Sequence, residues 1–249
     1  MGVDVLSDTS QVRRLSVDLT EDARLVLADL DGCLISEGRP FPDARDFVEA
    51  CGDRLWIISN NSSHTAEALS AELAAIGLHV TADRILLAGE QTLRHLRTVQ
   101  PGRSIALYAS DCLKAQARSI GLQAECQQPD IVILCRDPGF AIPQMADVAA
   151  QCLRGARLWV SNTDNAHPGQ DGRPVPETGA LLAALRAVMG EIPFDCIGKP
   201  HTHMAHAVLR LTGTAPEEAV FLGDSADTDG AIAQAMGMRF VHVVREGAA

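Results

Sequence analysis

The chain has 249 residues, of which 47% are hydrophobic, so it can form one large domain or two smaller ones. Its 32 acidic and 21 basic residues give a formal net charge of −11, which disfavours binding to nucleic acid or to an anionic membrane surface. We therefore expect neither partner, although a small anionic substrate remains compatible because it needs only a local cation.

The sequence also lacks the signals of export and membrane insertion. No apolar run reaches the roughly 18 residues of a spanning helix, and Met1–Thr20 has no hydrophobic region typical of a signal peptide. The cysteines are odd in number and none forms a C-x-x-C pair, which favours free thiols in a reducing compartment. These are Cys33, Cys51, Cys112, Cys126, Cys135, Cys152 and Cys196. We therefore expect a cytoplasmic protein.

The N-terminal part alternates between predicted strands and helices. Residues 1–22 show little apolar periodicity and are expected to be a tail. Continuous apolar runs at 24–28 and 55–58 are typical of buried parallel strands, and helices are expected over about 41–50 and 65–76. This order predicts an α/β fold with a Rossmann-like, doubly wound parallel sheet.

The same alternation continues to the end of the chain. Residues 167–174, rich in glycine, proline and aspartate, have the composition of a linker loop. Helices are expected near 113–120 and over 179–189, and strands are expected at 105–108, 131–134, 158–160, 195–200, 219–225 and 240–244.

Two carboxylates one residue apart follow the first predicted strand. Asp29 leaves the strand end, Asp31 lies just beyond it, and Gly32 allows a sharp turn. A buried carboxylate is costly unless it is paired or coordinated, which favours a functional site. The alternative is a helix-capping aspartate followed by a turn aspartate.

Polar residues also follow three later predicted strands, and parallel strands would bring these ends to one edge of the sheet. The residues are Ser59, Asn60, Lys199, Asp224 and Asp229. Oxygen ligands suit Mg²⁺, and a lysine with a helix N-terminus suits phosphate. Taken singly, Lys199 would be read as a surface lysine, and Asp224 and Asp229 as turn or cap residues.

These groups together suit metal-assisted hydrolysis of a phosphate ester. One carboxylate attacks phosphorus once the repulsion between the anions is neutralised by a metal and a lysine. A second carboxylate protonates the leaving oxygen and then activates the water that hydrolyses the covalent intermediate.

The four motifs resemble those of the haloacid-dehalogenase-like hydrolase superfamily. Residues 29–32 (Asp-Leu-Asp-Gly) are similar to its D-x-D-G motif, Ser59 to its second motif, Lys199 to its third, and residues 223–229 to the fourth, G-D-x₄-D. The runs 58–65, 161–164 and 176–182 resemble segments of the capped class IIA phosphatases, a subgroup with nitrophenylphosphatase-like and phosphoglycolate-phosphatase-like members. The resemblance covers about residues 24–244.

By this resemblance Asp29 is the nucleophile and Asp31 the general acid/base. Ser59 and Asn60 would hold the phosphoryl oxygens, and Lys199 would bridge the phosphate and the nucleophile. Mg²⁺ would be held by Asp29, Asp224 and the backbone carbonyl of Asp31, with Asp229 near the metal through water.

The resemblance further implies two domains. A catalytic core would comprise residues 1–82 and 178–249, including the tail at 1–22, and an α/β cap would comprise 83–177. Caps of this kind also allow a homodimer. The expected partner is a small phosphorylated substrate, with sugar phosphates, nucleotide monophosphates, aryl phosphates, phosphoglycolate and pyridoxal phosphate all open.

Some residues depart from the family pattern or stay unassigned. Cys33, His64 and Glu177 replace the residues usual at their positions. Asn162 and Asp164 are read as either structural or substrate-facing residues of the cap. Packed or solvated roles are expected for His201, His203 and His206, although His201 lies close enough to Lys199 in sequence to reach a substrate.

Three other functions compete with phosphatase activity. A phospho-accepting signalling receiver uses similar strand ends but lacks an acid two residues after the nucleophile and an inserted domain. A silent binding protein on the same scaffold is disfavoured by the intact motifs. Dehalogenase chemistry is disfavoured by Asp31.

Overall fold

The computed structural model describes residues 9–169 and 173–245, which form two compact units. The first unit takes the described residues of Met1–Ser59, Ser70–Leu86 and Lys199–Ala249. The second takes those of Asn60–Leu69 and Leu87–Gly198. Among the described residues, no helix has both the length and the apolar character needed to cross a membrane.

A six-stranded sheet forms the centre of the first unit, in the order β1-β14-β13-β2-β5-β6. The pairs β1–β14, β14–β13, β13–β2 and β2–β5 are parallel. Both faces of the central strands are buried, which explains their continuous apolar runs. The strands are β1 (Thr9–Val12), β2 (Leu25–Ala28), β5 (Leu55–Ser59), β6 (Ile85–Leu87), β13 (Ala219–Gly223) and β14 (Arg239–Val243).

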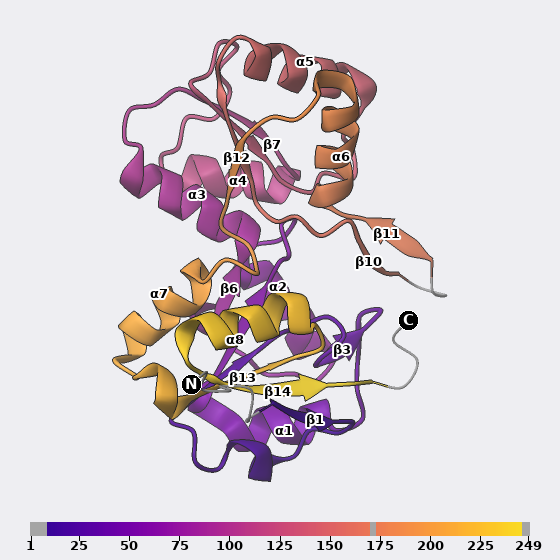
Figure 1. The fold of residues 1–249 in the computed structure, drawn as a ribbon, viewed down its shortest axis with the longest axis vertical. Helices are drawn as coiled ribbons and strands as arrows, with labels where there is room; N and C mark the ends of the chain where they lie inside the picture. Colours follow the sequence, from indigo (N-terminus) through magenta and orange to yellow (C-terminus); the bar gives the residue numbers. More distant parts are fainter. Residues whose placement is uncertain (1–8, 170–172, 246–249) are drawn as a thin grey trace, which may run out of the picture. The chain divides into compact units, whose positions relative to one another are not determined.

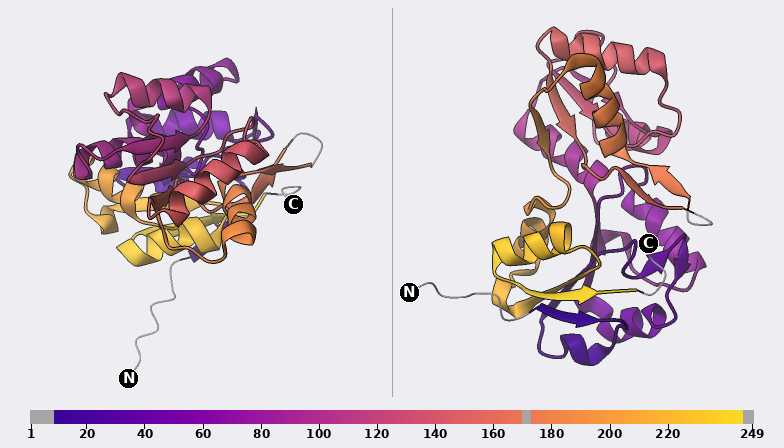
Figure 2. Two further views of the ribbon diagram at one scale, coloured as in Figure 1. Left: turned by 90° about the horizontal axis from the view of Figure 1, so that it is seen from above. Right: turned by 45° about the vertical axis from the view of Figure 1, so that its right-hand side comes forward.

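Helices cover both faces of this sheet, so the predicted doubly wound α/β core is confirmed. In Figure 1, α8 (Ala231–Met236) lies on one face and α1 (Ala44–Cys51) on the other, and the right-hand view of Figure 2 shows the same layers. The apolar residues of α1 recur at helical spacing and are buried. The remaining helices of this part are α2 (Ala66–Ala75), whose first residues count with the second unit, and α7 (His203–Thr212).

The N-terminal segment differs from the expected tail. Residues 1–8 lie outside the described residues, but β1 adds a parallel edge strand beside β14. Apolar periodicity could not reveal this strand because its sequence, Thr-Ser-Gln-Val, is mostly polar. At an edge, backbone hydrogen bonding to one neighbour suffices and little side-chain burial is needed.

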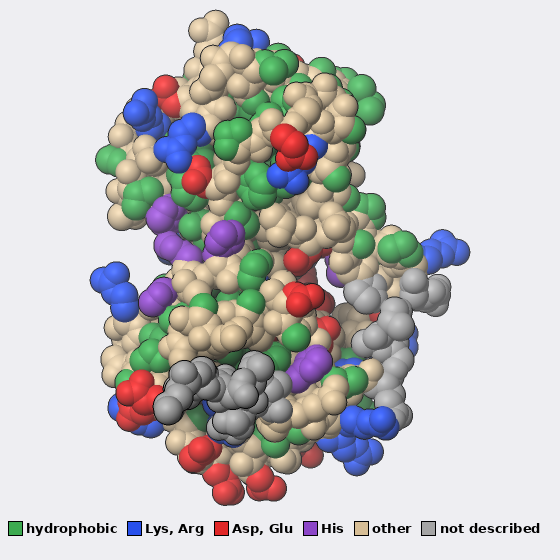
Figure 3. Space-filling model, in the orientation of Figure 1, with side chains coloured by type: hydrophobic (Ala, Val, Ile, Leu, Met, Phe, Trp, Pro, Cys, Tyr) green, Lys and Arg blue, Asp and Glu red, His purple; other side chains and the backbone are tan. Residues whose placement is uncertain are grey.

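The second unit contains its own four-stranded parallel sheet, in the order β12-β9-β8-β7. Its strands are β7 (Ile105–Tyr108), β8 (Ile131–Leu134), β9 (Arg157–Val160) and β12 (Phe194–Cys196). Its helices are α3 (Ala88–Val99), α4 (Asp111–Ser119), α5 (Ile142–Leu153) and α6 (Thr178–Met189). Charged side chains of both signs are interspersed over the face of each unit seen in Figure 3.

Alternating residues of β8 and β9 separate the two faces of this sheet. Val132, Leu134, Leu158 and Val160 form one buried cluster with residues of α5 and α6. Trp159 faces the other way, and its ring lies 5.4 Å from that of His95 in α3. The second unit is therefore also an α/β layer structure with helices on both faces.

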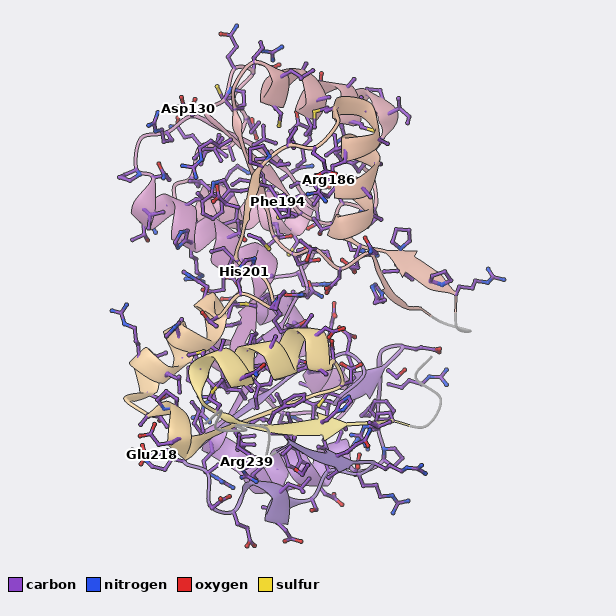
Figure 4. The ribbon with its side chains drawn as sticks, in the orientation of Figure 1. Asp130, Arg186, Phe194, His201, Glu218 and Arg239 are labelled. Carbon is purple, nitrogen blue, oxygen red and sulfur yellow. The ribbon has the colours of Figure 1, made fainter. Side chains whose placement is uncertain are left out.

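The expected domain boundary at residue 178 differs from this division. Helix α6 contributes Leu182 and Leu185 to the core of the second unit, and β12 pairs with β9 of the same unit. Figure 4 shows Arg186 of α6 beside Phe194 of β12. The guanidinium carbon of Arg186 lies 5.1 Å from the centre of the Phe194 ring. An apolar helix and a short strand carry no sign of which sheet they join, so the motifs alone could not show to which unit α6 and β12 belong.

The glycine- and proline-rich segment contains two short strands where a linker loop was expected. Strand β10 (Ala166–Pro168) pairs antiparallel with β11 (Pro174–Pro176). Residues 170–172 lie outside the described residues. A second short hairpin, β3 (Ile35–Ser36) with β4 (Arg39–Pro40), follows the Asp29–Gly32 motif.

The placement of α6 predicts where a core truncation acts. Leu185→Ala removes a fully buried side chain and should destabilise the second unit by about 2–5 kcal/mol. Hydrogen exchange of the β8 amides should accelerate while that of the β13 amides stays unchanged. Val188→Ala is the control, because Val188 on the same helix is 64% exposed. Faster exchange in β13 instead would place α6 with the first unit.

Candidate active site

Asp29 lies immediately after the central strand β2 of the first unit. Its backbone N–H donates to Leu222 O of β13 at 2.8 Å, so the chain direction there is fixed by the sheet. The residue is only 7% exposed. Ser59 ends the neighbouring strand β5, and Asp224 directly follows β13, so adjacent parallel strands deliver three predicted site residues to one edge.

A turn after β13 returns Asp229 to the same place. Residues Ala226–Gly230 form a π-helical turn, and the fully buried Asp229 accepts a hydrogen bond from the Ser225 N–H. One oxygen each of Asp29, Asp224 and Asp229 lies within 4.8 Å of the others. Asp224 is the most exposed of the three.

Lys199 joins this acidic cluster, as predicted, although the strand that precedes it belongs to the sheet of the second unit. Its Nζ donates to Asp29 Oδ1 at 2.6 Å and to Asp229 Oδ1 at 2.7 Å. The expectation that Lys199 follows a strand of the core sheet is wrong, because β12 belongs to the sheet of the second unit. The local sequence looks the same in either sheet, so no signal distinguished the two.

The charges of the cluster are strongly coupled. Burial alone would lower the pKa of Lys199, but the charges of Asp229 and Asp29 outweigh it and raise that pKa, so the amine stays protonated. Burial and the charge of Asp29 raise the pKa of Asp224 to about 7. Burial also raises the pKa of Asp229 to about 8, against the opposing effect of Lys199.

This donor set fits a divalent cation. Three carboxylates face one ammonium group, so the ionised cluster carries excess negative charge that a cation would neutralise. The atoms of the three carboxylates that could bind a metal are oxygens, and hard cations such as Mg²⁺ prefer oxygen ligands. Gly32 also leaves room for the cluster, because a Cβ at that position would overlap the carboxylate of Asp224.

Asp31 is not part of the cluster of three carboxylates, although it follows Asp29 by two residues. It is exposed and forms a β-bridge with Ile35 across the turn that precedes the β3–β4 hairpin. Its side chain is therefore not one of the three carboxylates that together could hold a metal. This placement is compatible with a proton-transferring group rather than with a carboxylate ligand.

Asn60 begins the second unit and is held there by a buried network. Asn162 is fully buried, and its Nδ2 donates to Asn60 O at 2.8 Å and to Ser62 Oγ at 3.1 Å. The Asn60 Nδ2 donates to Asp164 Oδ2 at 3.0 Å. Asn162 and Asp164 thus support the segment of the second motif from within the second unit.

Three residues to which the sequence analysis gave no role complete this support. Ser62 Oγ shares a hydrogen bond with Thr178 Oγ1 at 2.9 Å and accepts one from the backbone N–H of Arg136 at 3.0 Å. The Arg136 side chain also pairs with Glu177 at 3.3 Å. Glu177 therefore has an ion-pair partner in this chain, which the sequence could not show because the two residues are far apart.

The remaining unassigned residues lie outside the cluster. His64 is half-buried, and its backbone N–H donates to Asn61 Oδ1 at 3.0 Å, which closes a local turn. His201, labelled in Figure 4, is exposed ahead of α7, and His206 of α7 is exposed as well. The cysteines are free throughout the chain, as predicted.

Known proteins share both the sequence pattern and the fold. Residues 26–123 match a family model described as haloacid dehalogenase-like hydrolase, and residues 196–248 match one described as HAD-hydrolase-like. A dihydroxyacetone phosphatase of Corynebacterium glutamicum is 29% identical over 82% of this chain and 74% of its own. The ribonucleotide monophosphatase NagD of Escherichia coli is 27% identical over 82% of this chain and 80% of its own.

The solved structures agree with these matches. The p-nitrophenyl phosphatase from Archaeoglobus fulgidus superposes with a TM-score of 0.80 at 26% identity, covering 89% of this chain and 86% of that one. The chain belongs to the haloacid-dehalogenase-like hydrolase superfamily. The prediction of a capped class IIA phosphatase within it is confirmed.

The close approach at Gly32 generates a first prediction for this site. Gly32→Ala should lower activity and metal affinity, because the new Cβ displaces the carboxylate of Asp224. Gly38→Ala is the control: Gly38 has a similar positive φ of 73°, but nothing lies within 4 Å of a Cβ there. Both variants should lose about 1 kcal/mol of stability from backbone strain. Equal activities of the two variants would contradict the prediction.

The raised pKa of Asp224 generates a second prediction. A carboxyl whose folded pKa lies above its unfolded value binds more protons when folded, so metal-free stability is lost as pH rises from about 4 to about 7. With chelator at pH 8, Asp224→Asn should therefore raise the unfolding temperature by at least about 2 °C. At pH 4 most of the gain should be lost, and with Mg²⁺ at pH 8 the order should reverse. A gain that is equal at both pH values would contradict the assignment.

Proposed function

We propose that this phosphatase hydrolyses small phosphate monoesters with the help of Mg²⁺ and through a phosphorylated Asp29. The observation that carries the proposal is the buried cluster of Asp29, Asp224, Asp229 and Lys199. The named relatives act on phosphorylated substrates, which supports the same substrate class here. The candidates are sugar phosphates, nucleotide monophosphates and aryl phosphates.

Asp29 is the proposed nucleophile because it lies at the end of the central strand with one oxygen held by Lys199. Its carboxylate attacks phosphorus, the bond from phosphorus to the leaving oxygen breaks, and an aspartyl phosphate forms. Ser59 and Asn60 are the proposed ligands of the phosphoryl oxygens. Lys199 supplies a fixed positive charge that favours the approach of two anions.

Asp31 is the proposed general acid and base. It donates a proton to the leaving oxygen in the first step and removes a proton from the attacking water in the second. Water then displaces Asp29 from phosphorus, inorganic phosphate leaves, and the carboxylate is regenerated. The exposed position of Asp31 suits this role because the proton must reach an alcohol and a water in turn.

Asp29, Asp224 and Asp229 are proposed to hold the metal, the last through water, with the Asp31 carbonyl as a further ligand. Bound Mg²⁺ would neutralise the phosphate and the carboxylates as a Lewis acid. The ion pairs of Lys199 with Asp29 and Asp229 hold these two carboxylates in place before the metal binds.

The second unit is proposed to act as a cap that selects the substrate. The support is the network around Asn162, which joins the segment starting at Asn60 to the body of that unit. A receiver function is less well supported, because the chain carries Asp31 and a second α/β unit. Dihydroxyacetone phosphate and ribonucleotide monophosphates are the first substrates to compare, together with nitrophenyl phosphate.

Replacing the nucleophile provides the principal test. Asp29→Asn should abolish turnover of nitrophenyl phosphate with Mg²⁺ while the circular dichroism spectrum is retained, and chelation should abolish turnover of the wild type. Asp22→Asn is a matched control, because Asp22 is exposed and pairs with Arg239 at the surface. Turnover retained by Asp29→Asn would rule out the covalent mechanism.

The proton-transfer role has a separate test. Asp31→Asn should lower kcat/KM for an alkyl phosphate on the order of 10²–10⁴-fold. The loss should be smaller for nitrophenyl phosphate, because nitrophenolate leaves without needing a proton. An unchanged ratio between the two substrates would contradict the acid role of Asp31.

A further inference from the structure

Arg245 follows β14, the last strand of the first unit. Like Lys199, it is a buried cation. Its side chain is only 4% exposed. Nε and Nη2 both donate to Cys33 O, at 3.1 and 2.7 Å, and Nη1 donates to Asp43 Oδ2 at 2.8 Å and to Arg13 O at 3.2 Å. The planar fork of an arginine suits such simultaneous contacts, which a lysine could not reproduce.

The carbonyl that Arg245 binds belongs to the turn that carries Asp31. In this turn the N–H groups of Leu34 and Ile35 donate to Leu30 O at 2.9 and 3.0 Å, and the Gly32 N–H donates to Ile35 O at 2.8 Å. The turn runs directly from the nucleophile into the β3–β4 hairpin. The hydrogen bonds from Arg245 to Cys33 O therefore fix the loop that carries Asp31 at a point just after that residue.

Arg245 is itself held from the opposite side. Burial alone would raise the pKa of Asp43, but hydrogen bonds from Arg245 and from the Leu15 N–H lower it, so this carboxylate stays ionised. The guanidinium carbon also lies 4.2 Å from the centre of the Phe41 ring, within range of a cation–π contact. These partners join the N-terminal segment, the start of α1 and the C-terminal segment around one side chain.

We propose that Arg245 is a positioning residue that holds Asp31 in reach of the leaving oxygen. General acid catalysis depends on distance, and a displacement of about 1 Å can reduce the rate on the order of 10²-fold. A clamp on Cys33 O restricts this displacement without contacting the substrate. The inference rests on the proposed role of Asp31 and extends it to a residue outside the four motifs.

A purely structural role would have a different signature. If Arg245 only stabilised the fold, its loss would reduce the turnover of all substrates together. If it positions Asp31, the loss should depend on how much the leaving group needs a proton. The comparison is kcat/KM for glycerol phosphate, an alkyl ester, against kcat/KM for nitrophenyl phosphate, since this parameter reports the steps up to departure of the leaving group.

The variants are Arg245→Gln, Arg245→Lys and Asp43→Asn, assayed with saturating Mg²⁺ at a temperature where each is folded. Arg245→Gln should lower kcat/KM for the alkyl phosphate about 10- to 100-fold and that for nitrophenyl phosphate less than about threefold. Arg245→Lys should give an intermediate loss. Arg239→Gln is the control, because Arg239 pairs with the exposed Asp22 at the surface, and the variant should leave both values unchanged.

A double-mutant cycle with Asp31→Asn tests the coupling directly. Because both changes remove the same proton transfer, adding Arg245→Gln to Asp31→Asn should lower the alkyl-phosphate rate by less than about threefold. Independent, multiplying effects would overturn the inference, as would equal losses for both substrates. If Arg245→Gln does not fold, Arg245→Lys and Asp43→Asn carry the same cycle, since the first keeps a buried cation and the second keeps the hydrogen bonds from Arg245 to Cys33 O.

This experiment separates the inference from the function on which it rests. If Asp31→Asn does not change the ratio between the two substrates, the acid role itself is wrong. If Asp31→Asn changes the ratio and the Arg245 and Asp43 variants do not, the acid role stands and the positioning role of Arg245 is overturned.

Discussion

The buried ion pairs of Lys199 with Asp29 and Asp229 are the interaction on which the site depends. An ammonium and two carboxylates inside a protein each lose favourable hydration, and only close, well-aligned pairing offsets the loss. Distances of 2.6 and 2.7 Å provide this pairing. Asp224 remains outside these contacts with Lys199 and adds negative charge, which makes the cluster more stable with a cation than without one.

The parallel sheet is the scaffold that makes this concentration of charge possible. Strands β13, β2 and β5 lie next to one another and run in the same direction, so residues that follow them in sequence meet in space. Short turns then place Asp229 and the Asp31 loop around Asp29. The energy needed to hold like charges together comes from the apolar strands beneath, which are almost completely buried.

Much of the site could be predicted because strand ends carry visible polar residues after apolar runs. Asp29, Ser59 and Asp224 were placed correctly at one edge of the core sheet by that pattern alone. Lys199 joined the predicted cluster although its strand belongs to the other sheet, since sequence shows a strand but not its partners. The contacts of Arg245 and the contact of Ser62 with Thr178 could not be predicted, because each joins residues that lie far apart in the chain.

The division of the chain into two units constrains how such a protein can be altered. The chain passes from one unit to the other four times, between residues 59 and 60, 69 and 70, 86 and 87, and 198 and 199. The first and the last of these joints are each adjacent in sequence to a proposed site residue, Ser59 or Lys199. Exchanging the whole second unit for that of a relative would therefore require splices within one residue of Ser59 and of Lys199, so the exchange would alter the backbone beside two proposed site residues.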